Sequence, residues 1–276
     1  NNTSLTTFFC YNNQLTSIVG LGNTNVNDLR CSGNQLTSLD VSGLPALFKL
    51  HCQINQLTAL DVSMNPLLND LRCNNNQISS LNLATNSQLG ILFCQYNQLA
   101  TLNLGTTSGI TFMHCHENQL TTLDVSQHSG LTELQCNGNL LTHVDITQNP
   151  DLVTLYAHDN SLTCLVANNG QDLDLNILNN PQLTCASVTY PPYAVANALY
   201  DPIVNFNVVC GGPINNDVDI DQTTVILSAQ LNGASYQWLD CSANYAPIPG
   251  AIYQDYSADS TGFYAVELTF TDCFGT

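Results

Sequence analysis

The stretch LFKLHCQINQLTALDVSMNPL, residues 47–67, is one unit of a repeat that runs through most of the 276-residue chain. Its cysteine, Cys52, has counterparts every 21 residues, and its Asn55 and Leu57 belong to columns with the same spacing. The cysteine column consists of Cys10, Cys31, Cys52, Cys73, Cys94, Cys115 and Cys136. Such a strict period is the signature of a solenoid, in which each coil buries its apolar side against the next.

Alternation within each unit predicts a short β-strand before the cysteine. In Leu29-Arg30-Cys31, the leucine and the cysteine point inward and Arg30 points outward. We therefore predict a mainly β solenoid of about nine coils, with parallel sheets and little helix. The second half-unit, such as Leu60-Asp61-Val62, also alternates and could form a second strand. Neighbouring cysteines come within reach of a disulfide, but their side chains run parallel into a packed core and seven is an odd number, so we predict small buried hydrophobes with free thiols. A straight row also cannot supply the tetrahedral geometry of zinc.

The asparagine column follows the cysteines by three residues, where the chain turns out of the strand. It is formed by Asn13, Asn34, Asn55, Asn76, Asn97, Asn118, Asn139 and Asn160. Stacked amides at this place can satisfy backbone groups that a turn leaves unpaired. The Asn-Pro steps at Asn65-Pro66 and Asn149-Pro150 mark the turn from one coil to the next.

Composition excludes several classes of function. Three Lys and Arg residues stand against 21 Asp and Glu residues, a formal net charge of -18. Such a surface repels nucleic acid and anionic membranes, and no apolar run reaches the ~18 residues of a membrane-spanning helix. The sequence contains no nucleophile elbow, phosphate-binding loop, metalloprotease motif or dinucleotide fingerprint. We therefore predict that the chain is not an enzyme.

The repeat text resembles that of a known protein class. The segments NQLTSLDVS (residues 34–42), NQLTALDVSMNPLL (55–68) and NQLTTLDVS (118–126) are similar to the short, nested leucine-rich repeats called IRREKO. They are particularly similar to the large secreted repeat proteins of bacteria that use type IX secretion. The resemblance covers about residues 5–210. It implies a leucine-rich-repeat solenoid and a secreted or cell-surface location.

The end of the array also fits this class, in which the repeats often close with an LTC segment and a later cysteine. Here the segment is residues 183–185 and the later cysteine is Cys210. We predict a domain over 1–210 whose residues 186–210 form a C-terminal cap, pinned by a Cys185–Cys210 disulfide. Cys164 lies one coil before Cys185, so Cys164–Cys185 is the competing pair. Either disulfide implies an oxidising compartment outside the cytoplasm.

A different pattern begins after the array. Residues 211–221 are predicted to be a linker, and 222–276 resemble an immunoglobulin-like β-sandwich with Trp238 as the core aromatic and Tyr264 at the tyrosine-corner position. Cys241 and Cys273 lie near the ends of two predicted strands and could form a disulfide. The module falls short of the roughly 100 residues of a full sandwich, so we expect it to be incomplete.

One sheet face gathers the candidate binding residues. All three basic residues of the chain lie there in consecutive coils, with aromatic and histidine side chains in the same columns. The candidates are Phe9, Arg30, Lys49, His51, Arg72, Phe93, Phe112, His114 and Tyr156. Arginines and aromatics are the residues that binding hot spots favour. Alternatively, Asp28, Lys49 and Asp70 form weak surface ion pairs, or the face packs on another subunit.

Metal sites are only weakly indicated. His114 and His116 point outward together, but no third ligand is evident, so no metal is predicted there. A calcium site near the linker is weakly indicated by three alternating aspartates, Asp217, Asp219 and Asp221. The segment lacks the glycine and glutamate of an EF-hand loop. We predict no other cofactor.

The sequence leads to two functional hypotheses. The first is a non-enzymatic extracellular binding or adhesion protein that recognises a protein or a glycan on the outward sheet face. The alternative is a structural segment of an extracellular filament or cell-surface appendage, assembled from identical subunits by self-association. Burial of Phe93 and Phe112 between subunits would favour assembly, whereas a monomer that leaves them free would favour ligand binding.

Overall fold

The structure is a computed structural model whose contacts divide the chain into two compact units, 1–208 and 209–276. Each unit is described separately. The described residues are 4–22, 25–105, 109–189, 194, 196–207, 216–220, 225–228, 235–240, 246–253, 255–258 and 262–269.

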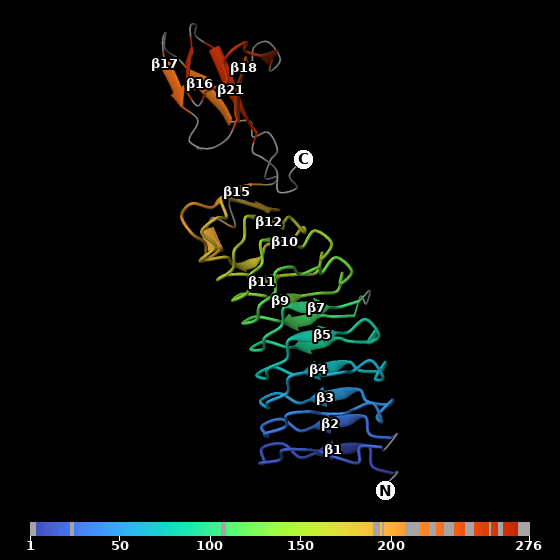
Figure 1. Cartoon of the computed structure of the whole chain (residues 1–276). Helices are drawn as coiled ribbons and strands as arrows, with labels where there is room; N and C mark the ends of the chain where they lie inside the picture. Colours follow the sequence, from blue (N-terminus) through green and yellow to red (C-terminus); the bar gives the residue numbers. More distant parts are fainter. Residues whose placement is uncertain are drawn as a thin grey trace. The chain divides into compact units, whose positions relative to one another are not determined.

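The first unit is a parallel β-solenoid built on a nine-stranded sheet (Figure 1). Successive strands pair in parallel and in register, so that Leu29 faces Leu50 and Leu50 faces Leu71. We number the coils 1 to 9 by the strands of this sheet. The strands are β1 (Thr7–Phe9), β2 (Asp28–Arg30), β3 (Lys49–His51), β4 (Asp70–Arg72), β6 (Ile91–Phe93), β8 (Phe112–His114), β9 (Glu133–Gln135), β11 (Thr154–Tyr156) and β13 (Asp174–Asn176). The predicted mainly β solenoid is confirmed, and the described helical residues are confined to 194 and 196–197.

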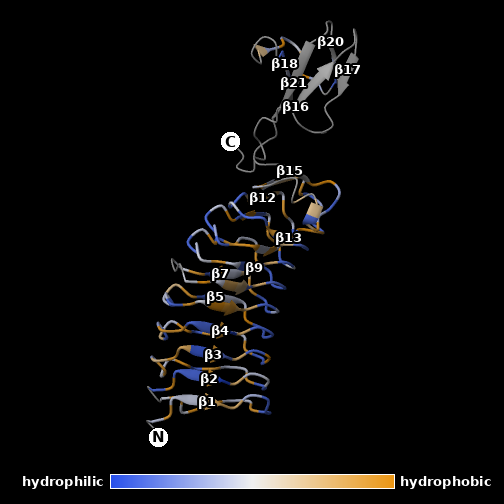
Figure 2. Cartoon of the chain, turned by 180° about the vertical axis from the view of Figure 1, so that it is seen from behind, coloured by the Kyte–Doolittle hydropathy of each residue, from blue (hydrophilic) through white to orange (hydrophobic). Residues whose placement is uncertain are grey.

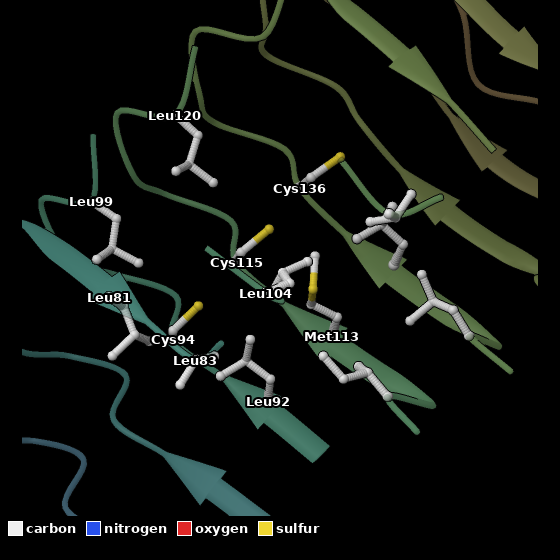
Figure 3. Packing of buried hydrophobic residues seen from close by; sticks show 14 of the residues in the cluster. Leu81, Leu83, Leu92, Cys94, Leu99, Leu104, Met113, Cys115, Leu120 and Cys136 are labelled. Carbon is white, nitrogen blue, oxygen red and sulfur yellow. The ribbon is translucent and has the colours of Figure 1, made fainter. Parts of the chain in front are cut away.

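The core lies inside the coils and is made of stacked leucines and cysteines. Leu92, Cys94, Leu120 and their counterparts in neighbouring coils are fully buried, and Figure 3 shows how the cysteine column packs beside the leucines. The six cysteines from Cys31 to Cys136 are buried free thiols, while Cys10 of coil 1 is half-buried. The prediction that the column serves as packing is therefore confirmed for these residues.

The asparagine column ties adjacent coils together, as predicted. Asn55 donates from Nδ2 to the carbonyl oxygens of Cys31 and Cys52 at 3.0 Å each, and its Oδ1 accepts from the Leu36 amide at 3.0 Å. The same three bonds recur from coil to coil. A second asparagine column, predicted only as a turn signal, is buried: Asn65 donates to the carbonyl oxygens of Val41 and Leu44 at 3.0 and 2.8 Å.

The second half of each coil forms a strand only in some coils. β5 (Ser80–Asn82) pairs with β7 (Thr101–Asn103), and a separate sheet has the order β10-β12-β14-β15. Its strands are β10 (His143–Asp145), β12 (Cys164–Ala167), β14 (Cys185–Val188) and β15 (Asn205–Asn207). Residues 60–62, for which the sequence allowed a second strand, do not form a strand. Hydropathy repeats at the same place in successive coils (Figure 2).

The end of the array brings two cysteines together. β12 and β14 pair with Leu165 opposite Ala186, so Cys164 and Cys185 lie in register on neighbouring strands. Neither is among the free thiols. Cys210 lies outside the described residues, so the Cys185–Cys210 disulfide stays a prediction beside the competing Cys164–Cys185 pair. β15, from the predicted cap, extends this sheet by pairing with β14.

The second unit contains two antiparallel sheets. One has the order β16-β21-β18-β19 and the other pairs β17 with β20. Trp238 is buried, donates from Nε1 to the Tyr253 carbonyl oxygen at 3.0 Å, and stacks on Tyr256. The immunoglobulin-like identification stays a prediction. The strands are β16 (Asn216–Ile220), β17 (Val225–Ser228), β18 (Ser235–Asp240), β19 (Ala246–Pro247), β20 (Asp255–Ala258) and β21 (Gly262–Thr269).

The linker predicted over 211–221 differs from the structure, since 216–220 form β16 and pair with β21. Asp217 and Asp219 therefore belong to a strand, and Asp221 lies outside the described residues, as do Cys241 and Cys273. The calcium site and the Cys241–Cys273 disulfide stay predictions.

Candidate functional site

The candidate site is the outward face of the nine-stranded sheet, here called the front face. Because side chains alternate across a strand, the leucine of each strand turns inward and its two neighbours turn outward. Leu50 of β3 is fully buried, for example, while Lys49 and His51 are half-buried. Register pairing then aligns equivalent outward side chains of successive coils in columns. The front face is thus a direct product of the 21-residue period.

All nine candidate binding residues lie at outward positions of this sheet. Phe9 and Phe112 are exposed, and the other seven are half-buried. One column runs through Phe9, Arg30, His51, Arg72, Phe93, His114, Gln135 and Tyr156. Phe112 and Lys49 belong to the column two residues earlier.

Carboxylates hold two of the three cations. Arg30 donates from Nε and Nη2 to Asp28 at 3.0 and 2.8 Å, and Arg72 makes the same two-point contact with Asp70 at 3.0 and 3.2 Å. The partners are two residues apart in one strand, so their side chains project from the same face. Lys49, in contrast, has no ion pair within the described part of the chain. The ion pairs expected among Asp28, Lys49 and Asp70 are therefore replaced by pairs within strands.

Asp70 is the most buried charged group on the front face. It receives Arg72 and also contacts His51, whose Nε2 lies 2.9 Å from Asp70 Oδ2. Burial alone would raise the pKa of Asp70, but the hydrogen bonds from His51 and Arg72 outweigh it and hold the pKa at about 2. The carboxylate is thus charged at any ordinary pH, and it fixes side chains from two adjacent coils.

Planar side chains form a stacked ladder along the same column. The Arg72 guanidinium lies 5.1 Å from the centre of the Phe93 ring, and the other side of Phe93 stacks on His114 at 4.4 Å with an interplanar angle of 14°. Arg30 lies over Phe9 in the same manner, at 4.8 Å. The Nε2 atom of His114 lies 2.8 Å from Glu133 Oε1, within hydrogen-bond distance. Further along, the Tyr156 hydroxyl donates to Asp174 at 2.8 Å.

A group of histidines adjoins this ladder. His114 and His116 have ring centres 6.0 Å apart, and Tyr96 contacts His116 edge-on. Burial, together with the nearby His114 and His158, lowers the pKa of His116 to about 4, so this ring is neutral at pH 7. Among the described residues, no group of three or more His, Cys, Asp or Glu side chains is arranged to hold a metal ion.

Exposed apolar side chains at the two rims of the front face, before and after the strands, were not among the predicted binding residues. Phe48 precedes β3 and is exposed, and Ile54 and Tyr96 are exposed in the turns that follow β3 and β6. The signal was available in the turn column, where most coils place asparagine, aspartate or glycine and these two place large apolar or aromatic residues.

Catalysis by the cysteine column is disfavoured by its environment. Burial raises the pKa of the Cys31, Cys73 and Cys136 thiols to about 12, and that of Cys94 and Cys115 also rises. A thiolate is the reactive form of cysteine, so these groups are inert in the folded solenoid. No helix in the described part of the chain is long and apolar enough to cross a membrane.

Comparison with known proteins places the solenoid among leucine-rich-repeat structures. No protein-family model and no curated protein matches the chain. The functional domain of InlJ from Listeria monocytogenes, which includes a cysteine ladder, is 27% identical over 74% of this chain and 55% of its own, with a TM-score of 0.57. YopM from Yersinia enterocolitica is 24% identical over 74% of this chain and 42% of its own, with a TM-score of 0.58. The chain spans about half the length of these proteins.

A leucine-rich repeat protein from Bacteroides thetaiotaomicron adds a likeness of fold alone, at 15% identity and a TM-score of 0.57 over 74% of this chain and 30% of its own. The InlJ domain shares both the coil architecture and the cysteine ladder. The chain has the leucine-rich-repeat fold.

Proposed function

We propose that this chain is a non-enzymatic, extracellular binding protein whose front face recognises a protein partner. One observation carries the proposal: the chain has only three basic residues and a net charge of -18, yet all three lie side by side on this face among stacked aromatic rings. Arginine and aromatic side chains dominate the energetics of protein interfaces. The location outside the cytoplasm rests on the resemblance of the repeats and on the predicted disulfides.

The stacking geometry favours a protein over a glycan. A sugar ring binds an aromatic side chain by lying over its face. Both faces of Phe93 are already occupied, one by the Arg72 guanidinium and the other by the His114 ring. The ladder therefore offers ring edges to a partner, and edges suit the side chains of an apposed protein surface.

The ion pairs also prepare the face for binding. Interfaces lose affinity when flexible side chains must be ordered on association. Here Asp28 orders Arg30, Asp70 orders Arg72 and His51, and Glu133 orders His114 before any partner arrives. The entropy cost of ordering these long side chains is thus already met in the free protein.

The experiment compares two variants of equal charge on arrays of purified extracellular proteins and of glycans. Arg30→Gln combined with Phe112→Ser alters the front face, and Thr101→Asp lowers the net charge by the same one unit on the exposed side of β7. We expect the wild type and Thr101→Asp to bind the same proteins, and the front-face variant to lose at least about tenfold in affinity, or 1.4 kcal/mol.

Equal binding by all three proteins would contradict a role for the front face, and selective binding to glycans would contradict a protein partner. Assembly from identical subunits remains the second candidate, because Phe9 and Phe112 are exposed on the same face. Sedimentation velocity tests assembly by measuring the mass of the protein in solution. A concentration-dependent oligomer that the front-face variant abolishes would favour assembly.

A further inference from the structure

Coil 3, residues 48–68, exposes an unusual number of large apolar side chains. Among the described residues, fifteen large hydrophobic side chains are exposed, and four of them belong to this coil: Phe48, Ile54, Met64 and Leu67. The neighbouring coils place Asn27 and Asn69 at the position of Phe48, and Gly33 and Asn75 at the position of Ile54. Large exposed apolar residues gathered on one element mark an interaction surface rather than ordinary scatter.

Ile54 has a strained backbone conformation that an asparagine or glycine at the same position would avoid. The turn after each strand takes a left-handed residue, and Asn75 and Asn12 supply it at φ values of 56° and 54°. Ile54 adopts φ 56° although a β-branched side chain is disfavoured there, and 59% of its surface is exposed. Little packing within the chain compensates for this strain. Strained residues that persist on a surface point to a function.

Charge distinguishes the outward side chains of β3, which begins at Lys49. Lys49 lies between the two rims and, within the described residues, has no ion pair. On either side of His51, the register places Arg30 and Arg72. The rest of this strongly acidic chain contains no other Lys or Arg. On the front face of coils 2–4 the three cations stand against two carboxylates, Asp28 and Asp70, so Lys49 is the cation available to an approaching carboxylate on a chain that is otherwise strongly acidic.

We propose that coil 3 is the centre of the recognition surface and that it binds an extended protein segment with a carboxylate between two apolar side chains. The apolar side chains would contact Phe48 at one rim and Ile54 at the other, and the carboxylate would pair with Lys49. Six residues separate Phe48 from Ile54, and because Ile54 lies in the turn after β3, the two side chains are less than the ~20 Å of a fully extended segment apart. The proposal rests on the proposed function of the front face and specifies the chemistry of its partner.

Leu67 and Met64 are two further exposed apolar side chains of coil 3. They lie in the turn that leads into β4. At the end of this turn the backbone N–H of Asn69 donates to the Phe48 carbonyl oxygen at 2.9 Å, so the turn leads to the rim at which Phe48 lies. No equivalent extension exists beside Ile54, where the neighbours in the turn column are Gly33 and Asn75. The partner segment should therefore carry its larger apolar group at the Phe48 end.

The test uses a random dodecapeptide library displayed on phage, selected against the full chain. We expect enriched peptides to contain Asp or Glu flanked on both sides by apolar residues. A synthetic peptide of that consensus should lose at least tenfold in affinity, measured by calorimetry, on Ile54→Asn and on Lys49→Glu. Leu140→Asn removes an exposed leucine of a distant coil and should leave affinity unchanged.

Melting temperature separates a binding effect from unfolding. Ile54→Asn relieves the left-handed strain, so its melting temperature should rise while its affinity falls, a combination that mere damage to the fold cannot produce. Unchanged affinity of Ile54→Asn, no enrichment on the wild type, or a consensus without an acid would overturn the proposal. A wild-type dimer that Ile54→Asn dissociates would assign coil 3 to a second copy instead.

Failure of this inference is distinguishable from failure of the proposed function. If Arg30→Gln with Phe112→Ser abolishes binding to a protein target while Ile54→Asn and Lys49→Glu retain it, the front face binds without coil 3 at its centre. If none of these variants changes binding to that target, the front face itself is not the binding surface.

Discussion

At the scale of single residues, Asp70 shows how one buried carboxylate organises a surface. It receives Arg72 from its own strand and His51 from the preceding coil, so the two outward columns of coils 3 and 4 are locked together. Removing a partner from a buried charge leaves that charge uncompensated, which costs more than the pair itself contributes. The geometry of the front face in these coils therefore depends on this residue.

Asp70→Asn should destabilise the protein in a pH-dependent manner. The folded pKa, about 2, lies below the value near 3.9 expected of an unfolded Asp, so the stabilisation is complete above pH ~4 and is lost as the pH falls toward 2. At pH 7 we expect the free energy of unfolding to drop by about 2 kcal/mol. Urea titrations at pH 7 and pH 2.5 measure this difference, with Asp151→Asn, an exposed site, as control. If the difference in unfolding free energy between the wild type and Asp70→Asn is as large at pH 2.5 as at pH 7, the lowered pKa of Asp70 is contradicted.

At the scale of the coil, the fold is held by close contacts between backbones one period apart. The asparagine columns bridge each coil to the one before it, and at some turns, such as those of Gly43 and Gly105, the backbones lie so close that a Cβ atom would overlap the preceding coil. Gly105 is the clearest case. It adopts φ 71°, and a Cβ atom there would lie 2.8 Å from the Ala84 Cα atom in the preceding coil. Only glycine meets both requirements.

Gly105→Ala should therefore cost more than strain alone. Gly20 is a matched control, because it has a similar φ of 76° but nothing within 4 Å of its position for a Cβ. We expect Gly20→Ala to destabilise by about 1–2 kcal/mol, from the left-handed conformation. Gly105→Ala should add about 1–3 kcal/mol from steric overlap. Thermal unfolding of the two variants gives the comparison, and equal losses would show that the contact with Ala84 relaxes freely.

At the scale of the whole solenoid, each coil is stabilised by its neighbours, so protection varies along the array. In coil 1 the apolar residues Leu5, Phe8 and Leu15 are only half-buried, whereas their counterparts in the interior coils are buried. The free energy of local opening is therefore lower in coil 1 of this chain.

Hydrogen exchange should report this gradient. We expect the amides of β1 to exchange at least about tenfold faster than those of β4, β6 and β8, because less apolar surface must be exposed to open coil 1. Mass spectrometry of peptic fragments resolves the segments. Uniform protection from coil 1 to coil 6 would mean that the array opens only as a single cooperative unit.

Much of this architecture was predictable from the sequence because residues 21 apart in the chain are neighbours in space. The cysteine, leucine and asparagine columns, the inward leucine of each strand and the gathering of the three cations on one face all follow from that period. Turn chemistry could likewise be read where asparagine or glycine recurs. In a solenoid, the local pattern already contains most of the tertiary contacts.

The tertiary structure alone decided how side chains compete for partners on that face. The sequence indicated that Asp28, Lys49 and Asp70 lie side by side, but the arginines two residues further on take the carboxylates and leave Lys49 without an ion pair among the described residues. Nor could the sequence reveal the burial of Asp70 or the stack of Arg72, Phe93 and His114. These features depend on side-chain conformation and local packing, which periodicity does not determine.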